Sequence, residues 1–167
     1  MPVGTTISVE EYLATAYEPD CDFIDGKIEE RNVGEWDHAR VQGRIYALLA
    51  QRYEGQGYLA APELRLRVAP NRFRVPDVCV FAGNPGQQVP SVAPVLCVEV
   101  LSPEDRMSRI EVRINDYLAM GVATVWILDP STRQAFVATA VEGLQEVKTG
   151  ILLAEGTRIQ LALSEIF

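Results

Sequence analysis

Two stretches of the chain decide its fold, residues 74–81 with the sequence RVPDVCVF and residues 95–102 with the sequence VLCVEVLS. Each is typical of a buried β-strand, because apolar residues run through it almost without interruption. Each also contains one carboxylate, Asp77 in the first stretch and Glu99 in the second. A lone charge inside an apolar strand is costly unless it is paired or binds a cation. The two acids therefore point to a function.

Length and composition describe one globular protein. The chain has 167 residues, of which 48% are hydrophobic, and this is enough for a proper core. We expect a single domain over residues 1–167. No stretch is long and apolar enough to span a bilayer, and the first residues lack the basic and then apolar order of a signal peptide. These features favour a cytoplasmic protein with no membrane partner.

The charge of the chain limits the ways in which it could bind nucleic acid. The net charge is −8, from 23 acids and 15 bases, which argues against a strongly basic nucleic-acid coat. A local basic patch stays open. The arginines form two groups, one around an expected hairpin (Arg65, Arg67, Arg72 and Arg74) and one on an expected helix (Arg106, Arg109 and Arg113). Each group fits a basic patch and fits equally a solvated face that pairs with nearby acids.

The first third of the chain carries three local structure signals. A serine followed three residues later by glutamate predicts a capped helix over residues 9–16. The Asp-Gly pair at residues 25–26 predicts a tight two-residue hairpin between short strands. Apolar residues at helical spacing predict a long helix over residues 36–53.

The rest of the chain alternates strands with one helix. Strands are expected over residues 63–70, 72–81, 95–102 and 122–130, with smaller strands in 134–150 and 157–163. Ser102 is expected to cap a second helix that ends at Met120, before Gly121. This order predicts an α/β (α+β) fold in which a central mixed β-sheet is flanked by helices.

The two acids fall on neighbouring elements of that sheet. If the strands that carry Asp77 and Glu99 pair, their carboxylates lie within several ångströms of each other, and each raises the pKa of the other unless a cation holds both ionised. Mg²⁺ or Mn²⁺ suits such a pair, because these ions take few protein ligands and leave room for a substrate phosphate. The alternative is structural: Asp77 caps a turn after Pro76, and Glu99 pairs with a helix arginine.

Several motifs together resemble a known family. The segments VPDV, VEVLSPEDR and DYLAMGVATVWILDP, with FIDGKIEE and His38 upstream, resemble the Uma2 family of restriction endonucleases, within the PD-(D/E)xK nuclease superfamily. The resemblance extends over nearly the whole chain. It implies a restriction-endonuclease-like fold and Mg²⁺-dependent phosphodiester cleavage of DNA. It also implies a metal site at Asp77 and Glu99, with the backbone carbonyl of Val100 as a further ligand. By analogy with enzymes that cut both strands of a duplex, we expect a homodimer.

The chain departs from the superfamily pattern at its lysine. The superfamily places a lysine two residues after the glutamate, where this chain has Leu101. The Uma2 pattern instead takes a lysine from the next helix, four residues before Tyr117, and that residue is Arg113 here. An arginine can hold a phosphate but is a very poor general base. Arg113 therefore fits a catalytic role beside metal-activated water, with weak or absent activity as one consequence.

Four further residues are candidates for accessory roles: Glu30, His38, Glu63 and Arg109. His38 is either a proton shuttle or phosphate contact, or an exposed polar residue at a helix start. Glu30 and Glu63 either complete the metal shell or are surface charges. Arg109 shares a helix ridge with Arg113, and this ridge faces either the carboxylates or water.

Two other kinds of function stay open on the sequence alone. Leu101, Arg113 and the acidic net charge fit a catalytically degraded nuclease fold that binds nucleic acid or a protein partner. A scaffold homodimer is a third possibility, which rests on the expected edge strands.

Overall fold

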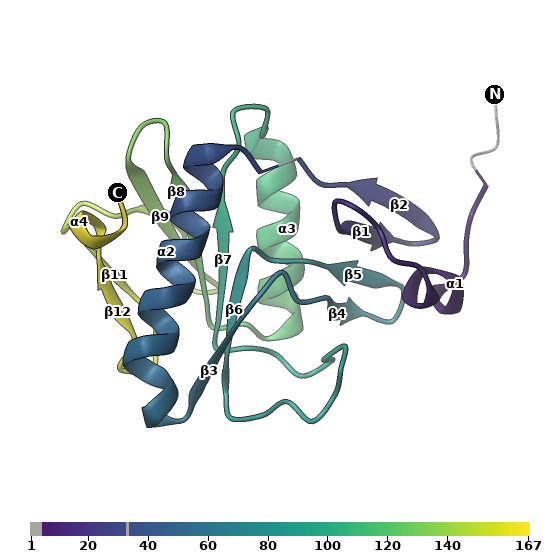
Figure 1. Cartoon of the computed structure of the whole chain (residues 1–167), viewed down its shortest axis with the longest axis horizontal. Helices are drawn as coiled ribbons and strands as arrows, with labels where there is room; N and C mark the ends of the chain where they lie inside the picture. The colour runs from purple at the N-terminus through teal and green to yellow at the C-terminus, as the bar shows by residue number, and fades with distance from the viewer. Residues whose placement is uncertain (1–4, 33) are drawn as a thin grey trace.

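A six-stranded sheet forms the centre of the computed structural model, which describes residues 5–32 and 34–167 (Figure 1). Its strands are β3 (Tyr58–Pro62), β6 (Val78–Ala82), β7 (Leu96–Val100), β8 (Thr124–Asp129), β9 (Gln134–Thr139) and β10 (Gly143–Glu146). They lie in the order β10-β9-β8-β7-β6-β3. The pair β7 and β8 is parallel and the other neighbours are antiparallel, so the sheet is mixed, as predicted.

One long helix covers each face of this sheet. Helix α2 (Trp36–Tyr53) packs on one face, and α3 (Met107–Met120), which connects the parallel strands β7 and β8, packs on the other (Figure 1). Side chains alternate along a strand, so Val98 and Val100 face α2, whereas Cys97 and Glu99 face α3. The expected sheet flanked by helices is thus confirmed.

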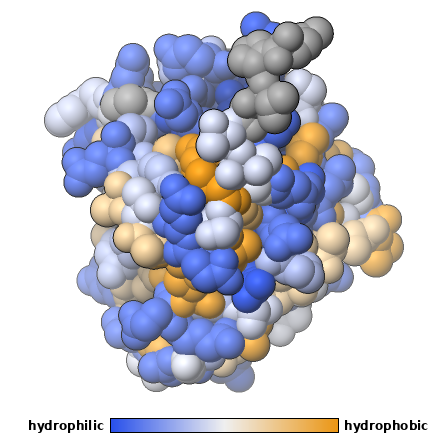
Figure 2. All heavy atoms as spheres, turned by 90° about the vertical axis from the view of Figure 1, so that its right-hand side faces the viewer, coloured by the Kyte–Doolittle hydropathy of each residue, from blue (hydrophilic) through white to orange (hydrophobic). Residues whose placement is uncertain are grey.

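A second, four-stranded sheet lies beside the first. Its strands are β1 (Cys21–Ile24), β2 (Lys27–Glu30), β4 (Leu66–Ala69) and β5 (Arg72–Arg74), in the order β2-β1-β5-β4. The short helix α1 (Val9–Ala14) places Tyr12 against Phe23 and Phe73. The face of the molecule at this end is mostly hydrophilic, with a narrow strip of hydrophobic atoms (Figure 2).

The chain ends beside α2. The remaining elements are the 3-10 helix η1 (Glu54–Gln56), the strands β11 (Ile151–Leu153) and β12 (Gln160–Ala162), and helix α4 (Leu163–Ile166). Leu152, Leu161 and Ile166 join the hydrophobic core under α2. None of the helices within residues 5–32 and 34–167 has the length and apolar character that a membrane span needs.

The second long helix begins later than predicted. It starts at Met107 with Arg106 as its cap, not at Ser102. The carboxylate of Asp105 accepts the backbone N–H of Ser102 at 2.6 Å, and the N–H of Asp105 donates to the carbonyl of Ser102 at 2.9 Å. These two bonds close a turn where the helix was expected. The predicted end is correct, because Gly121 follows the helix with a left-handed φ of 108°.

The predicted strand over residues 72–81 is two strands in two sheets. Strand β5 ends at Arg74 and β6 begins at Val78. The backbone N–H of Val75 donates to the Asp22 carboxylate at 2.9 Å, and Pro76 has no N–H to offer a neighbouring strand. Asp77 therefore lies at the break just before β6, not inside a strand. Two further differences concern β4, which lies in the second sheet, and β3, which the sequence pattern did not indicate.

Candidate active site

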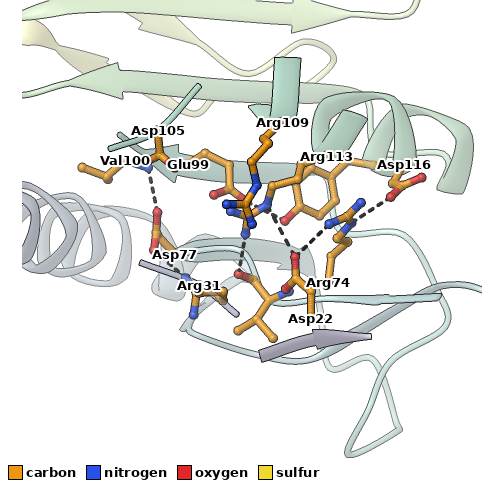
Figure 3. A network of polar contacts seen from close by, with 12 residues as sticks. Asp22, Arg31, Arg74, Asp77, Glu99, Val100, Asp105, Arg109, Arg113 and Asp116 are labelled. Atoms are coloured by element: carbon orange, nitrogen blue, oxygen red, sulfur yellow. Dashed lines mark hydrogen bonds and ion pairs between the residues drawn. The ribbon is translucent and has the colours of Figure 1, made fainter. Parts of the chain in front are cut away.

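Pairing of β6 with β7 brings the two acids together. The antiparallel register places Val78 opposite Val98. Asp77, just before β6, and Glu99, near the end of β7, therefore lie next to each other at the same edge of the sheet (Figure 3). Each side chain is only 2% exposed. Both line one small cavity of about 20 Å³, together with residues from the β2–α2 connection, α2, the end of β7 and α3.

Asp77 is held as a carboxylate by three donors. Its Oδ1 lies 2.8 Å from Nη2 of Arg31, and its Oδ2 accepts the backbone N–H of Val100 at 2.7 Å. Nε2 of His38 lies 3.5 Å from the same Oδ2. Burial raises the pKa of Asp77, but His38, the charge of Arg31 and the Val100 N–H outweigh it, and the net direction is downward. Asp77 is therefore ionised at neutral pH.

The backbone of Asp77 is fixed as well. Its carbonyl accepts the side-chain amide of Gln42 and the backbone N–H of Glu63, both at 3.2 Å. Gln42 belongs to α2, and Glu63 follows β3. The connection between β5 and β6 is thus held by α2 on one side and by the residue after β3 on the other. These bonds give the Asp77 carboxylate a defined direction.

Glu99 is equally buried but is held differently. Its Oε1 accepts the hydroxyl of Tyr117 at 2.5 Å and lies 3.2 Å from Nη2 of Arg113. Burial and the nearby Asp77 raise the pKa of Glu99, Arg113 and Tyr117 lower it, and the result is about 7. Glu99 therefore changes between its protonated and ionised forms near neutral pH.

Arg113 connects this site to a buried ionic network (Figure 3). Its Nη2 donates to the carbonyl of Val75 at 3.2 Å, and its Nε lies 3.7 Å from Oδ2 of Asp22. Asp22 also pairs with Arg74 at 3.0 Å, and Arg74 pairs with Asp116 at 2.7 Å. The network ties α3 to the second sheet and fixes the direction of Arg113.

Sequence reasoning missed Asp22 and Arg31, and it named Arg74 only as one of the arginines around a hairpin, not as a buried partner of Asp22 and Asp116. One signal was present: Asp22 lies between Cys21 and Phe23, in a short apolar strand, as Asp77 and Glu99 lie near apolar residues. Arg31 had no such signal, because it follows a strand whose last residue, Glu30, is exposed.

The structure brings some of the predicted residues together and separates others. Asp77, Glu99, Val100, His38 and Arg113 line the same cavity. Arg109 lies at the rim, half exposed, where it pairs with Glu29 at 3.1 Å and donates to the carbonyl of Glu30 at 3.3 Å.

The two remaining acids lie outside the cavity. The side chains of Glu30 and Glu63 are exposed, and neither lines the cavity that holds the carboxylate pair. The structural alternative predicted that Glu99 pairs with a helix arginine. This pairing is observed, as the contact of Glu99 with Arg113.

The donors at this site match a hard cation in kind but are already occupied. Mg²⁺ and Mn²⁺ prefer oxygen ligands, and the site offers the Asp77 and Glu99 carboxylates with the Val100 backbone beside them. Within residues 5–32 and 34–167, no three His, Cys, Asp or Glu side chains are grouped closely enough to hold a metal ion. Each carboxylate is also paired with an arginine. A cation would therefore have to replace Arg31 and Arg113.

Three buried polar atoms at the site lack a partner, and they indicate what else could bind there. Nε of Arg31, Nδ1 of His38 and Nε of Arg113 make no hydrogen bond within the described part of the chain. A buried donor without an acceptor is costly, and a phosphate group would supply several acceptor oxygens. The site thus combines two carboxylates with unsatisfied cationic side chains.

Comparison with known proteins gives the family. The model of the Uma2 family, described as "Putative restriction endonuclease", matches residues 9–165. The chain therefore belongs to the Uma2 family, and the resemblance drawn from its motifs is confirmed.

A solved structure gives the same answer for the fold. The chain is similar to the crystal structure of a "putative nuclease belonging to DUF820" from Anabaena variabilis, with a TM-score of 0.83 and 22% identity. The likeness covers 96% of this chain and 97% of that chain. It shows a shared fold, with the central mixed sheet and its helices. A search of the curated proteins finds no match.

Proposed function

We propose that this Uma2 protein is a divalent-metal-dependent endonuclease that hydrolyses phosphodiester bonds in DNA. One observation carries the proposal: the buried carboxylates of Asp77 and Glu99 line the same cavity as the cationic side chains of Arg31 and Arg113. The family description supplies the class of reaction.

The carboxylates are the proposed metal ligands. Asp77 and Glu99, with the backbone carbonyl of Val100, would hold Mg²⁺ or Mn²⁺. When bound, such an ion supplies an activated water and neutralises charge on the phosphate. Asp77 is already ionised, whereas Glu99 has to release its proton to become a ligand.

The two arginines are the proposed phosphate contacts. Arg31 and Arg113 now neutralise the carboxylates, one arginine for each acid. A cation between the carboxylates would release both guanidinium groups from these acids, and the Nε of each makes no hydrogen bond, although Arg113 stays paired with Asp22. A guanidinium group binds phosphate oxygens in a bidentate manner, so both arginines suit the scissile phosphate.

His38 is the proposed proton donor to the leaving oxygen. Burial lowers the pKa of His38, but the interaction with Asp77 more than offsets this, and the net direction is upward. The imidazole is therefore more readily protonated near neutral pH than a free histidine is. Arg113 cannot take a proton from water, because the neighbouring carboxylates of Glu99 and Asp22 raise its pKa further, against the effect of burial.

Cleavage of plasmid DNA with Mg²⁺, with Mn²⁺ and with chelator tests the proposal. We expect cleavage that requires metal and falls about 10³-fold or more in Asp77→Asn, since a ligand carboxylate is lost. Glu30→Gln is the matched control, because Glu30 is an acid of the same region that lies outside the cavity. Equal cleavage by Asp77→Asn and the wild type would contradict the assignment.

A second function is favoured by the pairing of both carboxylates with arginines and by Leu101 at the superfamily lysine position. In this case the protein is a catalytically degraded nuclease fold that binds nucleic acid or a protein partner. Calorimetry with Mn²⁺ separates the two. The nuclease gives binding heat that Asp77→Asn removes, and the degraded form gives none in either protein.

On a duplex substrate, a two-fold homodimer would place one active site on each strand. Light scattering measures this directly. A monomer at working concentration would restrict the proposed activity to one strand at a time.

A further inference from the structure

One hollow adjoins the proposed active site, and a second hollow adjoins the first. The inner hollow, of about 180 Å³, is lined by residues that include Trp36, Leu101 and Pro130, and it shares His38 and Ser102 with the cavity of the carboxylates. The outer hollow, of about 320 Å³, also contains Trp36 and Pro130. Because lining residues are shared, the inner hollow lies between the cavity of the carboxylates and the outer hollow.

Trp36 stands on the wall between the two hollows. It is the first residue of α2 and is 76% exposed, whereas the other tryptophan, Trp126, is completely buried. The guanidinium group of Arg40, one helical turn further on, lies 5.7 Å from the centre of the Trp36 ring. A large indole ring in water that is held in this way is a suitable surface for stacking.

Three arginines of the outer hollow, Arg40, Arg44 and Arg133, have no carboxylate partner. In the described part of the chain none of them forms an ion pair, whereas Arg31 and Arg113 both do. All three are exposed. Asp37 also lines this hollow, so three arginines face one aspartate among its described lining residues, and the local excess of positive charge suits anions.

The inner hollow is more acidic, although it shares Asp37 with the outer one. Its walls combine Trp36, Leu101 and two prolines with the acids Glu35, Asp37 and Asp129. Acids repel phosphate, but they accept hydrogen bonds from the amino groups of nucleobases. The inner hollow thus suits a base, and the outer hollow suits the phosphates that flank it.

We propose that the two hollows bind an unpaired nucleotide segment of single-stranded DNA next to the scissile phosphate. One base that carries an amino group lies against Trp36 in the inner hollow, and the following phosphates contact Arg40, Arg44 and Arg133. A base inside a duplex has both faces stacked, so only an unpaired base can use the indole ring. This inference rests on the proposed function, from which it takes DNA as the substrate.

Tryptophan fluorescence provides the first test, in chelator so that no cleavage occurs. Because Trp126 is buried, quenching on addition of oligo-dC reports on Trp36. We expect quenching in the wild type. With labelled oligo-dC, which does not depend on the fluorescence of Trp36, we expect binding that is roughly tenfold weaker in Trp36→Ala and nearly unchanged in Trp36→Phe, which keeps an aromatic ring. Val141→Ala is the matched control, because Val141 is 90% exposed and lines neither hollow.

Three outcomes would overturn the proposal. The first is equal affinity of the wild type and Trp36→Ala for labelled oligo-dC. The second is equal or tighter binding of a duplex of the same length. The third is tighter binding of oligo-dT, which has no amino group, or of a matched RNA.

The phosphate contacts are tested by salt dependence. We expect Arg133→Gln to flatten the dependence of affinity on salt concentration by roughly one charge, as loss of one phosphate contact requires. Arg158→Gln removes the same charge from an exposed site that lines neither hollow, and it should leave the slope unchanged. An equal slope for Arg133→Gln and the wild type would contradict the contact. Binding without metal is independent of cleavage, so the proposed nuclease can fail while this inference holds, and the reverse.

Discussion

The two sides of the proposed site each hold one buried carboxylate, and they shift its pKa in opposite directions. On the β6 side, Asp77 has a backbone N–H, an arginine and a histidine as partners, and its pKa is lowered. On the β7 and α3 side, Glu99 has a tyrosine hydroxyl and an arginine, and its pKa is raised to about 7. Both side chains are 2% exposed, so depth of burial does not explain the difference. The number and charge of the donors decide which acid stays ionised.

The largest difference between the two sides should appear in stability. We expect Asp77→Asn to destabilise the metal-free protein by about 3–5 kcal/mol, because Arg31 stays buried without its counter-ion. We expect the free energy of unfolding of Glu99→Gln to lie within about 1 kcal/mol of the wild-type value at pH 8, because the change removes a charge that is costly to bury. Urea unfolding of both variants measures this, and equal losses would remove the distinction between the two sides.

Stability should also fall as the pH rises. Burial raises the pKa of Glu99 from 4.5 to about 7, so between these pH values the folded protein binds more protons than the unfolded chain. His38 acts in the same direction, because its raised pKa gives stability that is lost above its folded pKa. Asp77 loses its contribution only when the pH falls through its lowered pKa.

Urea midpoints of the metal-free protein between pH 5 and pH 8 check this pH dependence. We expect the free energy of unfolding to fall by an amount on the order of 2–3 kcal/mol from pH 5 to pH 8, and the midpoint to fall with it. The same series in Glu99→Gln should be flatter, because its amide does not titrate. A wild-type midpoint that rises with pH would contradict the raised pKa of Glu99.

A smaller effect concerns the missing lysine. Arg113 approaches Glu99 at 3.2 Å, from the helix position where the Uma2 pattern has lysine. We expect Arg113→Lys to raise the metal-dependent cleavage rate about tenfold at pH 8 to 9, because an amine can accept a proton and a guanidinium group cannot. Leu101→Lys, at the superfamily position, is the comparison. Slower cleavage by Arg113→Lys would show that the contact of Arg113 with phosphate matters more than a base there.

The smallest effect isolates one hydrogen bond on the Glu99 side. Tyr117→Phe removes the hydroxyl that donates to Glu99 and leaves the packing of the ring in place. We expect the free energy of unfolding to fall by about 1 kcal/mol, because one buried hydrogen bond is lost. We also expect a further rise in the pKa of Glu99, because the hydroxyl lowers this pKa. Urea unfolding gives the first value and a carboxylate titration by NMR gives the second. An unchanged pKa would mean that the charges of Arg113 and Arg31 offset burial without the hydroxyl.

The parts of this site that local sequence patterns describe were predictable, and the parts that depend on distant partners were not. The spacing of apolar residues gave the helix over 36–53 correctly, because a periodic stripe is a local property. The position of acids beside apolar strands indicated Asp77 and Glu99. Arg31 lies 46 residues from Asp77 and Arg74 lies 52 from Asp22, and no local pattern connects such pairs.

Two errors in the predicted elements also have physical reasons. Ser102 has the pattern of a helix cap, but Asp105 turns back to bind its N–H, and so a local side-chain bond replaced the first helical turn. Residues 72–81 have the composition of one strand, but Pro76 and the bond from Val75 to Asp22 divide them between two sheets. In both places a side-chain contact helped to decide the course of the backbone.

The wide spacing of the site along the chain also determines when it can exist during synthesis. Translation delivers the chain from its N-terminus at roughly 5–20 residues per second. The β6–β7 pair can form once residue 100 is free, but Glu99 lacks the hydroxyl of Tyr117 and the charge of Arg113 until α3 has been made. The neighbour of β7 on its other side, β8, comes later still. A nascent chain on the ribosome therefore has no finished site until α3 and β8 have been made.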